Sequence, residues 1–135
     1  MANGTFKASL ITPEAIVLET QLKEAQIPAF DGLLGILDNR APLLAKLGTG
    51  VLRLTPNAGA PQRYLVSGGY AQMKDDALTI LVSEAIPASD ITPARVAAEQ
   101  ARLNAIEGTG TEALAQRQAI QARMLAMRSL SGASA

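Results

Sequence analysis

The chain has 135 residues, balances twelve basic residues against twelve acidic ones, and contains neither cysteine nor histidine. This length favours one compact domain with at most a short appendage, and zero net charge gives no overall field that would attract nucleic acid or anionic lipid. Disulfides, thiolate nucleophiles and imidazole ligands are excluded, so catalysis is less expected, although carboxylate chemistry stays open.

No stretch approaches the roughly 20 apolar residues that a membrane helix needs, and residues 1–7 lack the pattern of a signal peptide. We therefore expect any membrane contact to go through a partner. Only two phenylalanines and two tyrosines are present, which predicts an aliphatic core and makes base-stacking platforms for nucleic acid unexpected.

Residues 1–87 have the pattern of short strands and turns. Apolar and polar residues alternate from Phe6 to Leu10, as in a half-buried strand, and Pro28 is expected to end the second strand. Asp75-Asp76 is expected to form the turn before the last strand. The pattern predicts an all-β sandwich or barrel. The first expected strand is the alternating stretch from Phe6 to Leu10, and the other expected strands are residues 22–27, 51–54, 63–66 and 78–82.

Residues 88–135 have the composition of helices. Thr92 is a suitable N-cap and Pro93 suits the first helical position, so one helix is expected from about Thr92 to Ile106. Glycines in the 107–110 linker end it, and a second helix is expected from Thr111 to about Leu130. A linker this short predicts an antiparallel hairpin. The expected fold is therefore β + α: an N-terminal all-β sandwich followed by a C-terminal antiparallel two-helix hairpin.

Alanines repeat with the same i, i+4, i+7, i+11 spacing in both expected helices. Each set lies on one helix face, so we expect the two faces to pack together; the use of alanine as a general helix former is the plainer alternative. The larger apolar residues would then need cover from the sandwich or from another protein. The alanines are Ala94, Ala98, Ala101 and Ala105 in the first helix, and Ala115, Ala119, Ala122 and Ala126 in the second.

Arginines give the second helix a basic side, which suits either an acidic partner or a solvated face. They are Arg117, Arg123 and Arg128. In the first helix, Arg95, Glu99 and Arg102 are spaced for i, i+4 and i, i+3 ion pairs, a pattern typical of a surface that satisfies its own charges.

An ordered set of motifs runs through the sandwich half. It comprises Gly-x-x-Gly-Ile-Leu at 32–37, Ala-Pro-Leu-Leu at 41–44, Leu-Gly-Thr-Gly-Val-Leu at 47–52 and Val-Ser-Gly-Gly-Tyr at 66–70. In this order, and before a helical hairpin, the motifs resemble the ε subunit of the F-type rotary ATP synthase, called δ in mitochondria, over nearly the whole chain. The family usually has Pro-Gly-His before the Ala-Pro pair, where this chain has Asp38-Asn39-Arg40.

The resemblance implies a non-catalytic rotor subunit. Its sandwich would bind the foot of the γ subunit and the c ring, with Asp31, Gly32, Asp38 and Arg40 on the c-ring side, and would help to couple ion flow to rotation. It would lie peripherally on the cytoplasmic face of a bacterial inner membrane, since no transit peptide is evident, and would reach the membrane only through the complex.

The resemblance also implies two hairpin positions: folded on the sandwich, or extended along γ into the catalytic head, where the hairpin opposes ATP hydrolysis. The residues offered to the sandwich, to γ or to the β and α subunits would be Arg117, Ile120, Arg123, Met124, Met127 and Arg128. Some family members bind ATP through Ile/Leu-Asp-x-x-Arg-Ala. Only Ile91 and Arg95 match that motif here, so no nucleotide, other cofactor or metal is expected.

Two other function classes stay open. A free-standing adaptor would bind an acidic helix through the hairpin and would not co-purify with γ and the c ring. An enzyme would use Asp31, Asp38 and Glu84 as carboxylates around a cleft, although their places beside turn-forming residues explain them more simply.

Overall fold

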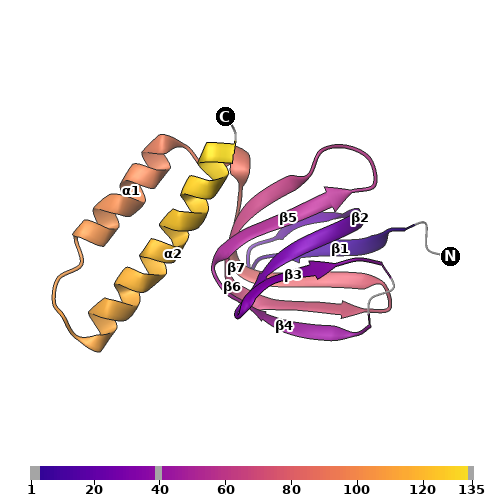
Figure 1. Ribbon diagram of the computed structural model, residues 1–135, viewed down its shortest axis with the longest axis horizontal. Helices are drawn as coiled ribbons and strands as arrows, with labels where there is room; N and C mark the ends of the chain where they lie inside the picture. Colours follow the sequence, from indigo (N-terminus) through magenta and orange to yellow (C-terminus); the bar gives the residue numbers. More distant parts are fainter. Residues whose placement is uncertain (1–3, 39–40, 134–135) are drawn as a thin grey trace.

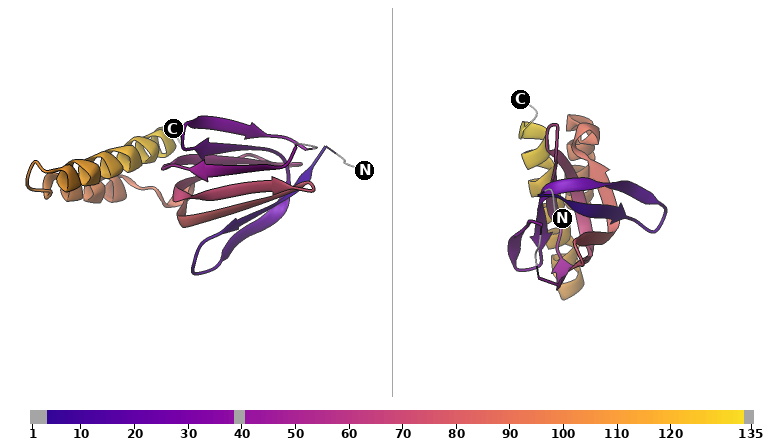
Figure 2. Two further views of the ribbon diagram at one scale, coloured as in Figure 1. Left: turned by 90° about the horizontal axis from the view of Figure 1, so that it is seen from below. Right: turned by 90° about the vertical axis from the view of Figure 1, so that its right-hand side faces the viewer.

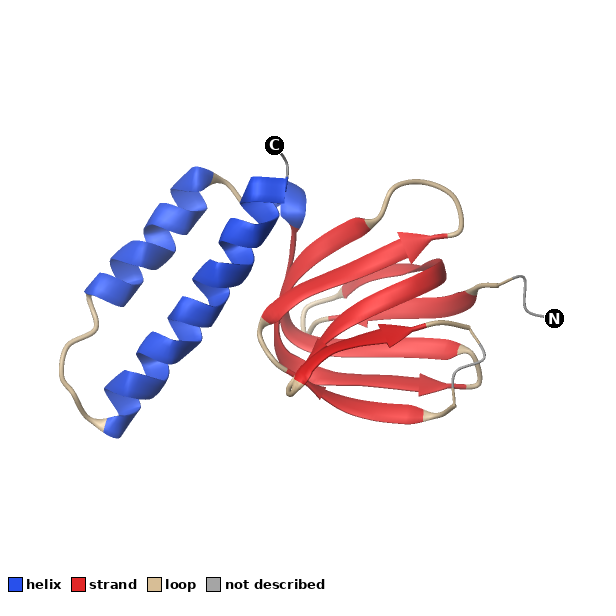
Figure 3. Ribbon diagram, viewed as in Figure 1, coloured by secondary structure: helices blue, strands red, loops and turns tan. Residues whose placement is uncertain are grey.

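The computed structural model describes residues 4–38 and 41–133, which form a strand-rich half and a helical hairpin lying side by side (Figures 1 and 3). Helix α2 lies between α1 and the strands. None of the described helices is long and apolar enough to cross a membrane. The elements are β1 (Phe6–Ile11), β2 (Ile16–Ala29), β3 (Gly32–Ile36), β4 (Leu43–Leu47), β5 (Gly50–Pro56), β6 (Gln62–Lys74), β7 (Ala77–Pro87), a 3-10 turn η1 (Ala88–Asp90), α1 (Pro93–Asn104) and α2 (Thr111–Ala133).

The strands lie together beside the hairpin, as the left-hand view of Figure 2 shows. Two long strands, β2 and β6, each pair with several others and so join the two layers of the sandwich. Along its length, β2 pairs first with β1, then with β5 and finally with β3. Strand β6 pairs with β5 through residues 62–66 and with β4 through residues 69–73, while β7 follows it on the other side. The sheet is closed further by the parallel pairing of β1 with β7. The result is a closed sandwich in which, among the described residues, β3 and β4 leave a weak seam between them.

A glycine pair lies where β6 passes from one layer to the other. Gly68 and Gly69 have φ values of 42° and 152°, and a Cβ on Gly69 would lie 1.9 Å from the Leu81 carbonyl oxygen. Only glycine fits this close approach of two backbones. The turn between β6 and β7 also has positive φ, at Asp75 (53°) and Asp76 (57°), as a two-residue hairpin turn requires, and the predicted turn is confirmed.

The sandwich core is aliphatic, as its composition predicts. In β1, Phe6, Ala8 and Leu10 are buried while Lys7 is exposed, so the predicted alternation is confirmed. The core continues through fully buried residues of the other strands, among them Leu22, Ile27, Ile36, Leu47, Leu52, Leu54, Met73, Leu78 and Ile80.

The strands are longer and more numerous than the sequence indicates. Pro28 does not end β2: it pairs with Leu33 of β3, and its carbonyl oxygen accepts a hydrogen bond of 2.9 Å from the Gly48 N–H. Proline lacks only the donor, so a strand can pass through it where the carbonyl still finds a partner. Strands β3 and β4 were not predicted, because their glycines and consecutive leucines hide the period of two.

The start of the hairpin follows the sequence prediction. The Thr92 hydroxyl oxygen accepts a hydrogen bond of 3.2 Å from the Arg95 N–H, and Pro93 is the first helical residue, which confirms the N-cap. Helix α1 ends at Asn104, two residues before the expected end, and the linker contains Gly108 with φ 93°.

The expectation that the alanine faces pack together is wrong. All four alanines of the α1 stripe are exposed, as are Ala115, Ala119 and Ala122 of α2, while Ala126 is buried against the sandwich. The helices meet through larger side chains instead, because burying these removes more apolar surface from water. Those that are buried or half-buried include Val96, Glu99 and Leu103 of α1, Ile106 of the linker, and Ile120, Met124 and Met127 of α2.

Candidate protein-interaction sites

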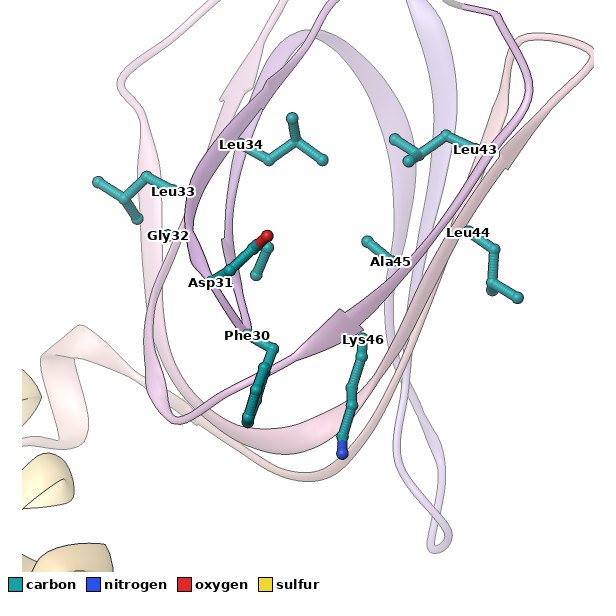
Figure 4. Close-up of a pocket in the computed structure, with 10 residues that line it drawn as sticks. Phe30, Asp31, Gly32, Leu33, Leu34, Leu43, Leu44, Ala45 and Lys46 are labelled. Carbon is teal, nitrogen blue, oxygen red and sulfur yellow. The ribbon is translucent and has the colours of Figure 1, made fainter.

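The seam between β3 and β4 opens into a cavity of about 540 Å³ (Figure 4). Strand β3 pairs with β2, and β4 pairs with β6 and meets β2 at Ala29↔Leu47; within the described residues, β3 and β4 have no pairing with each other. The cavity is lined by residues 29–34 and 43–46. We call it the β3/β4 opening.

Most of the side chains that line the β3/β4 opening are apolar, although polar atoms form the larger part of its exposed lining. Leu34, Leu43 and Ala45 point into it, and Asp31 reaches in from the turn before β3 (Figure 4). On its rim Phe30 is 71% exposed, Leu33 and Leu44 are also exposed, and the Lys46 ammonium lies 4.9 Å from the Phe30 ring centroid. An apolar rim with a few fixed charges is typical of a protein docking site.

The residues predicted for the c-ring side lie at or near this opening. Asp31 and Gly32 line it, and Asp38 is half-buried just beyond the end of β3; Arg40 falls outside the described residues. The enzyme alternative gains no support here, because the described lining includes Asp31 but neither Asp38 nor Glu84. The described residues also contain no cluster of three or more acidic side chains that could hold a metal.

A second apolar surface lies on the outer face of β1, β6 and β7. Tyr70 and Leu81 are cross-strand partners and both are half exposed, and Ile11 is the partner of Leu81 on its other side. Cross-strand partners share one face of the sheet. They border a shallow hollow of about 440 Å³ lined by residues 11–13, 68–70 and 81–83. We call this surface the Tyr70 patch.

The hairpin is docked on the sandwich through its own apolar cluster. Ala126, Met127 and Leu130 of α2 pack with Leu65 of β6 and with Ile86 and Ile91. Ile120 and Met124 are buried too, but each lines a groove within the hairpin: Ile120 with Arg102 of α1 and Ile106 of the linker, and Met124 with Leu103 of α1. The predicted Ile120-Met124-Met127 stripe is therefore covered partly by α1 and partly by the sandwich.

The three arginines of α2 have three different environments. Arg117 donates to the carbonyl oxygens of Gly108 (2.6 Å) and Ile106 (3.4 Å), and so closes the hairpin linker. Arg128 is exposed. Arg123 is largely buried and forms ion pairs with Glu84 of β7 and Glu99 of α1. Burial alone would lower the pKa of Arg123, but hydrogen bonds and charge from Glu84 and Glu99 raise it above its ordinary value.

The two residues that match the nucleotide motif make contacts within this protein, at the start of the hairpin. Ile91 is buried in the docking cluster, and the Arg95 guanidinium donates to the Asp90 carbonyl oxygen at 3.2 Å. Among the ion pairs of the described residues, the predicted Arg102–Glu99 pair is present at 2.9 Å and the predicted Arg95–Glu99 pair is not.

Sequence reasoning did not identify Ser67 and Glu84 as partners of the hairpin. They lie 56 and 39 residues from Arg123, and no local spacing relates them. The available signal was weaker: Glu84 is a charged residue near the end of the last strand before the hairpin.

Comparison with known proteins identifies the family. Residues 5–88 match the family described as ATP synthase, Delta/Epsilon chain, beta-sandwich domain. The chain belongs to this family. Among its relatives, the ATP synthase epsilon chain of Rhodopirellula baltica is 42% identical over 83 residues, an alignment spanning 62% of this chain and 64% of that one. The chloroplastic ATP synthase epsilon chain of Cucumis sativus is 34% identical over 126 residues, covering 92% of this chain and 90% of the other.

The fold also has close structural neighbours. A chain in the structure of the Euglena gracilis mitochondrial ATP synthase, OSCP/F1/c-ring in rotational state 1, superposes with a TM-score of 0.84. The match covers 96% of this chain and 82% of that chain at 18% sequence identity, so it supports the fold of this family member, hairpin included.

Proposed function

We propose that this chain is the epsilon subunit of a rotary ATP synthase, a non-catalytic part of the central stalk that couples ion flow through the c ring to rotation of γ. The observation that carries the proposal is the family membership, together with the alignment to an epsilon chain over sandwich and hairpin alike. The chain would lie peripherally on the cytoplasmic face of a bacterial inner membrane, held there by the complex.

The two apolar surfaces of the sandwich would supply the contacts that this function needs. The β3/β4 opening, with Asp31 and Gly32 on its lining and Asp38 nearby, would face the c ring. Arg40 would extend that contact. The Tyr70 patch would take the foot of γ, since a half-exposed tyrosine beside a leucine is the kind of anchor found at protein interfaces.

The hairpin would regulate ATP hydrolysis. In the docked position α2 covers Leu65 and Ile86 of the sandwich, and an extended hairpin would offer Ile120, Met124 and Met127 to γ instead. Its arginines, Arg117, Arg123 and Arg128, would then face acidic segments of the β and α subunits, where opposite charge favours contact.

Assembly and truncation test the proposal. The tagged chain is expected to co-purify with γ and the c ring; an adaptor would not. Ending the chain after Pro87 is expected to leave an assembled, coupled complex with raised ATPase activity, because the inhibitory element is gone. Unchanged hydrolysis in that complex would contradict the regulatory role while leaving the coupling role intact.

Charge reversal at Arg117, Arg123 and Arg128 together should reproduce the truncation if acidic segments hold the extended arm. Persistent inhibition would assign the contact to the apolar residues Ile120, Met124 and Met127 instead.

A further inference from the structure

One polar cluster joins the hairpin to the sandwich. Arg123 of α2 donates through Nη1 to Glu84 Oε1 and to Ser67 Oγ (3.3 Å), and through Nη2 to Glu99 Oε1 of α1 (3.2 Å). Ser67 in turn donates to the same Glu84 oxygen at 3.3 Å. One guanidinium thus links both helices to strands β6 and β7. We call Arg123, Glu84, Glu99 and Ser67 the Arg123 cluster.

The cluster is buried enough for its pairing to matter. The Arg123 side chain is 17% exposed and the Glu99 side chain 7%, whereas the Glu84 side chain is 37% exposed and its pairing is partly screened by solvent. Glu99 Oε2 and Arg123 Nε are buried without a hydrogen-bond partner, so the site already leaves hydrogen-bonding capacity unused. Removing the Glu84 charge would leave Arg123 paired with Glu99 of the hairpin, so it would weaken the link between hairpin and sandwich while the hairpin keeps its own ion pair.

Of the three arginines of α2, Arg123 alone is shared between the hairpin and the sandwich. Arg117 bonds to carbonyl oxygens of the hairpin itself and would move with it, and Arg128 is exposed while the hairpin is docked. Of the three, only Arg123 must break an ion pair with the sandwich, the one with Glu84, before it can bind an acidic surface elsewhere.

We infer that Glu84 is an internal competitor for Arg123: it imitates an acidic partner surface and holds the hairpin docked until such a surface replaces it. The competition rests on the proposed regulatory function, because that function supplies the acidic partner. The docking contact does not depend on it and can be measured on the isolated chain.

The first experiment measures docking in the isolated full chain. Because the chain has no cysteine, spin labels at Gln72→Cys on β6 and Gln118→Cys on α2 report one distance, by double electron–electron resonance. Glu84→Gln is expected to raise the undocked population about tenfold. The matched control is Glu24→Gln, an exposed glutamate of β2, which should leave the distance distribution unchanged. An unchanged distribution in Glu84→Gln, or an equal shift in the control, would overturn the inference.

The second experiment compares two substitutions that break the same ion pair in the assembled ATP synthase. Glu84→Gln frees Arg123 for the partner and is expected to lower ATPase activity. Arg123→Gln removes the shared group and is expected not to lower it, although it also undocks the isolated chain. Circular dichroism checks that both variants fold. Lowered activity in both variants would overturn the competition.

If Glu84→Gln undocks the isolated chain but neither variant changes hydrolysis in the complex, the docking contact stands and the proposed regulatory function fails. The two ideas are therefore separable by experiment.

Discussion

Replacing Met127 by alanine is expected to loosen α2 from the sandwich without unfolding the sandwich. Met127 is 1% exposed and lies in the cluster with Leu65, Ile86 and Leu130. Large-to-small substitution of a buried methionine costs about 2–5 kcal/mol, and the flexible neighbours of a docked helix favour the lower end of that range. A loss of about 2 kcal/mol corresponds to an opening equilibrium shifted about 30-fold.

Native-state hydrogen exchange is the suitable assay, because it reports local opening element by element. The amides of α2 around residues 120–130 should exchange about 30-fold faster in Met127→Ala, while those of β1, β6 and β7 keep their protection. Leu125→Ala, two residues away and 74% exposed, is the control and should have little effect. Equal acceleration in both variants, or equal acceleration in the β-strands, would refute the view that the hairpin opens as a separate unit through this cluster.

Three other substitutions test the sandwich and the hairpin base. Gly69→Ala should lower the thermal midpoint strongly, because its Cβ meets the Leu81 carbonyl oxygen, whereas Gly35→Ala, with no atom near its Cβ, should not. Thr92→Ala should cost about 1 kcal/mol of helix stability, seen as faster amide exchange in the first turn of α1, and unchanged exchange there would contradict a stabilising N-cap. Burial raises the pKa of Tyr64 above 10.0, because the folded protein favours the neutral phenol. The stabilisation of the folded state that comes from this neutral phenol is complete below pH 10, and it is lost as the pH rises through the raised pKa. Tyr64→Phe should remove a late component of the alkaline absorbance titration; a titration unchanged by Tyr64→Phe would contradict this.

Structural features that depend on neighbouring residues, such as helix starts, turns and strand alternation, could be predicted from the sequence. Thr92 and Pro93 specify a helix start through one hydroxyl and one fixed φ, and Asp75-Asp76 specifies a turn because both residues tolerate positive φ. The alternation from Phe6 to Leu10 likewise identified the buried face of β1. In each case the deciding interaction lies within a few residues.

Features decided by distant partners could not be predicted. Glu99 has the spacing of a solvated helix surface, yet it is buried because Arg123 reaches it from the other helix. The alanine spacing indicated a close helix contact, but the choice of face depended on which apolar residues the sandwich could cover. The exposure of Ala94 and Ala98 is the consequence. Pro28 was wrongly predicted to end a strand, because the residue that donates a hydrogen bond to its carbonyl oxygen, Gly48, comes twenty residues later.

The weak seam of the sandwich has a consequence for how the protein behaves before it finds any partner. A sheet edge with unpaired backbone groups can recruit a strand from another molecule and so start aggregation. Here the two edges at risk, β3 and β4, have only five residues each, and β4 carries Lys46 facing outward. Edges this short are poor templates for an added strand, and the lysine makes β4 a poorer one still. The seam can therefore stay open to side chains from outside while the free chain is protected from self-association along its strands.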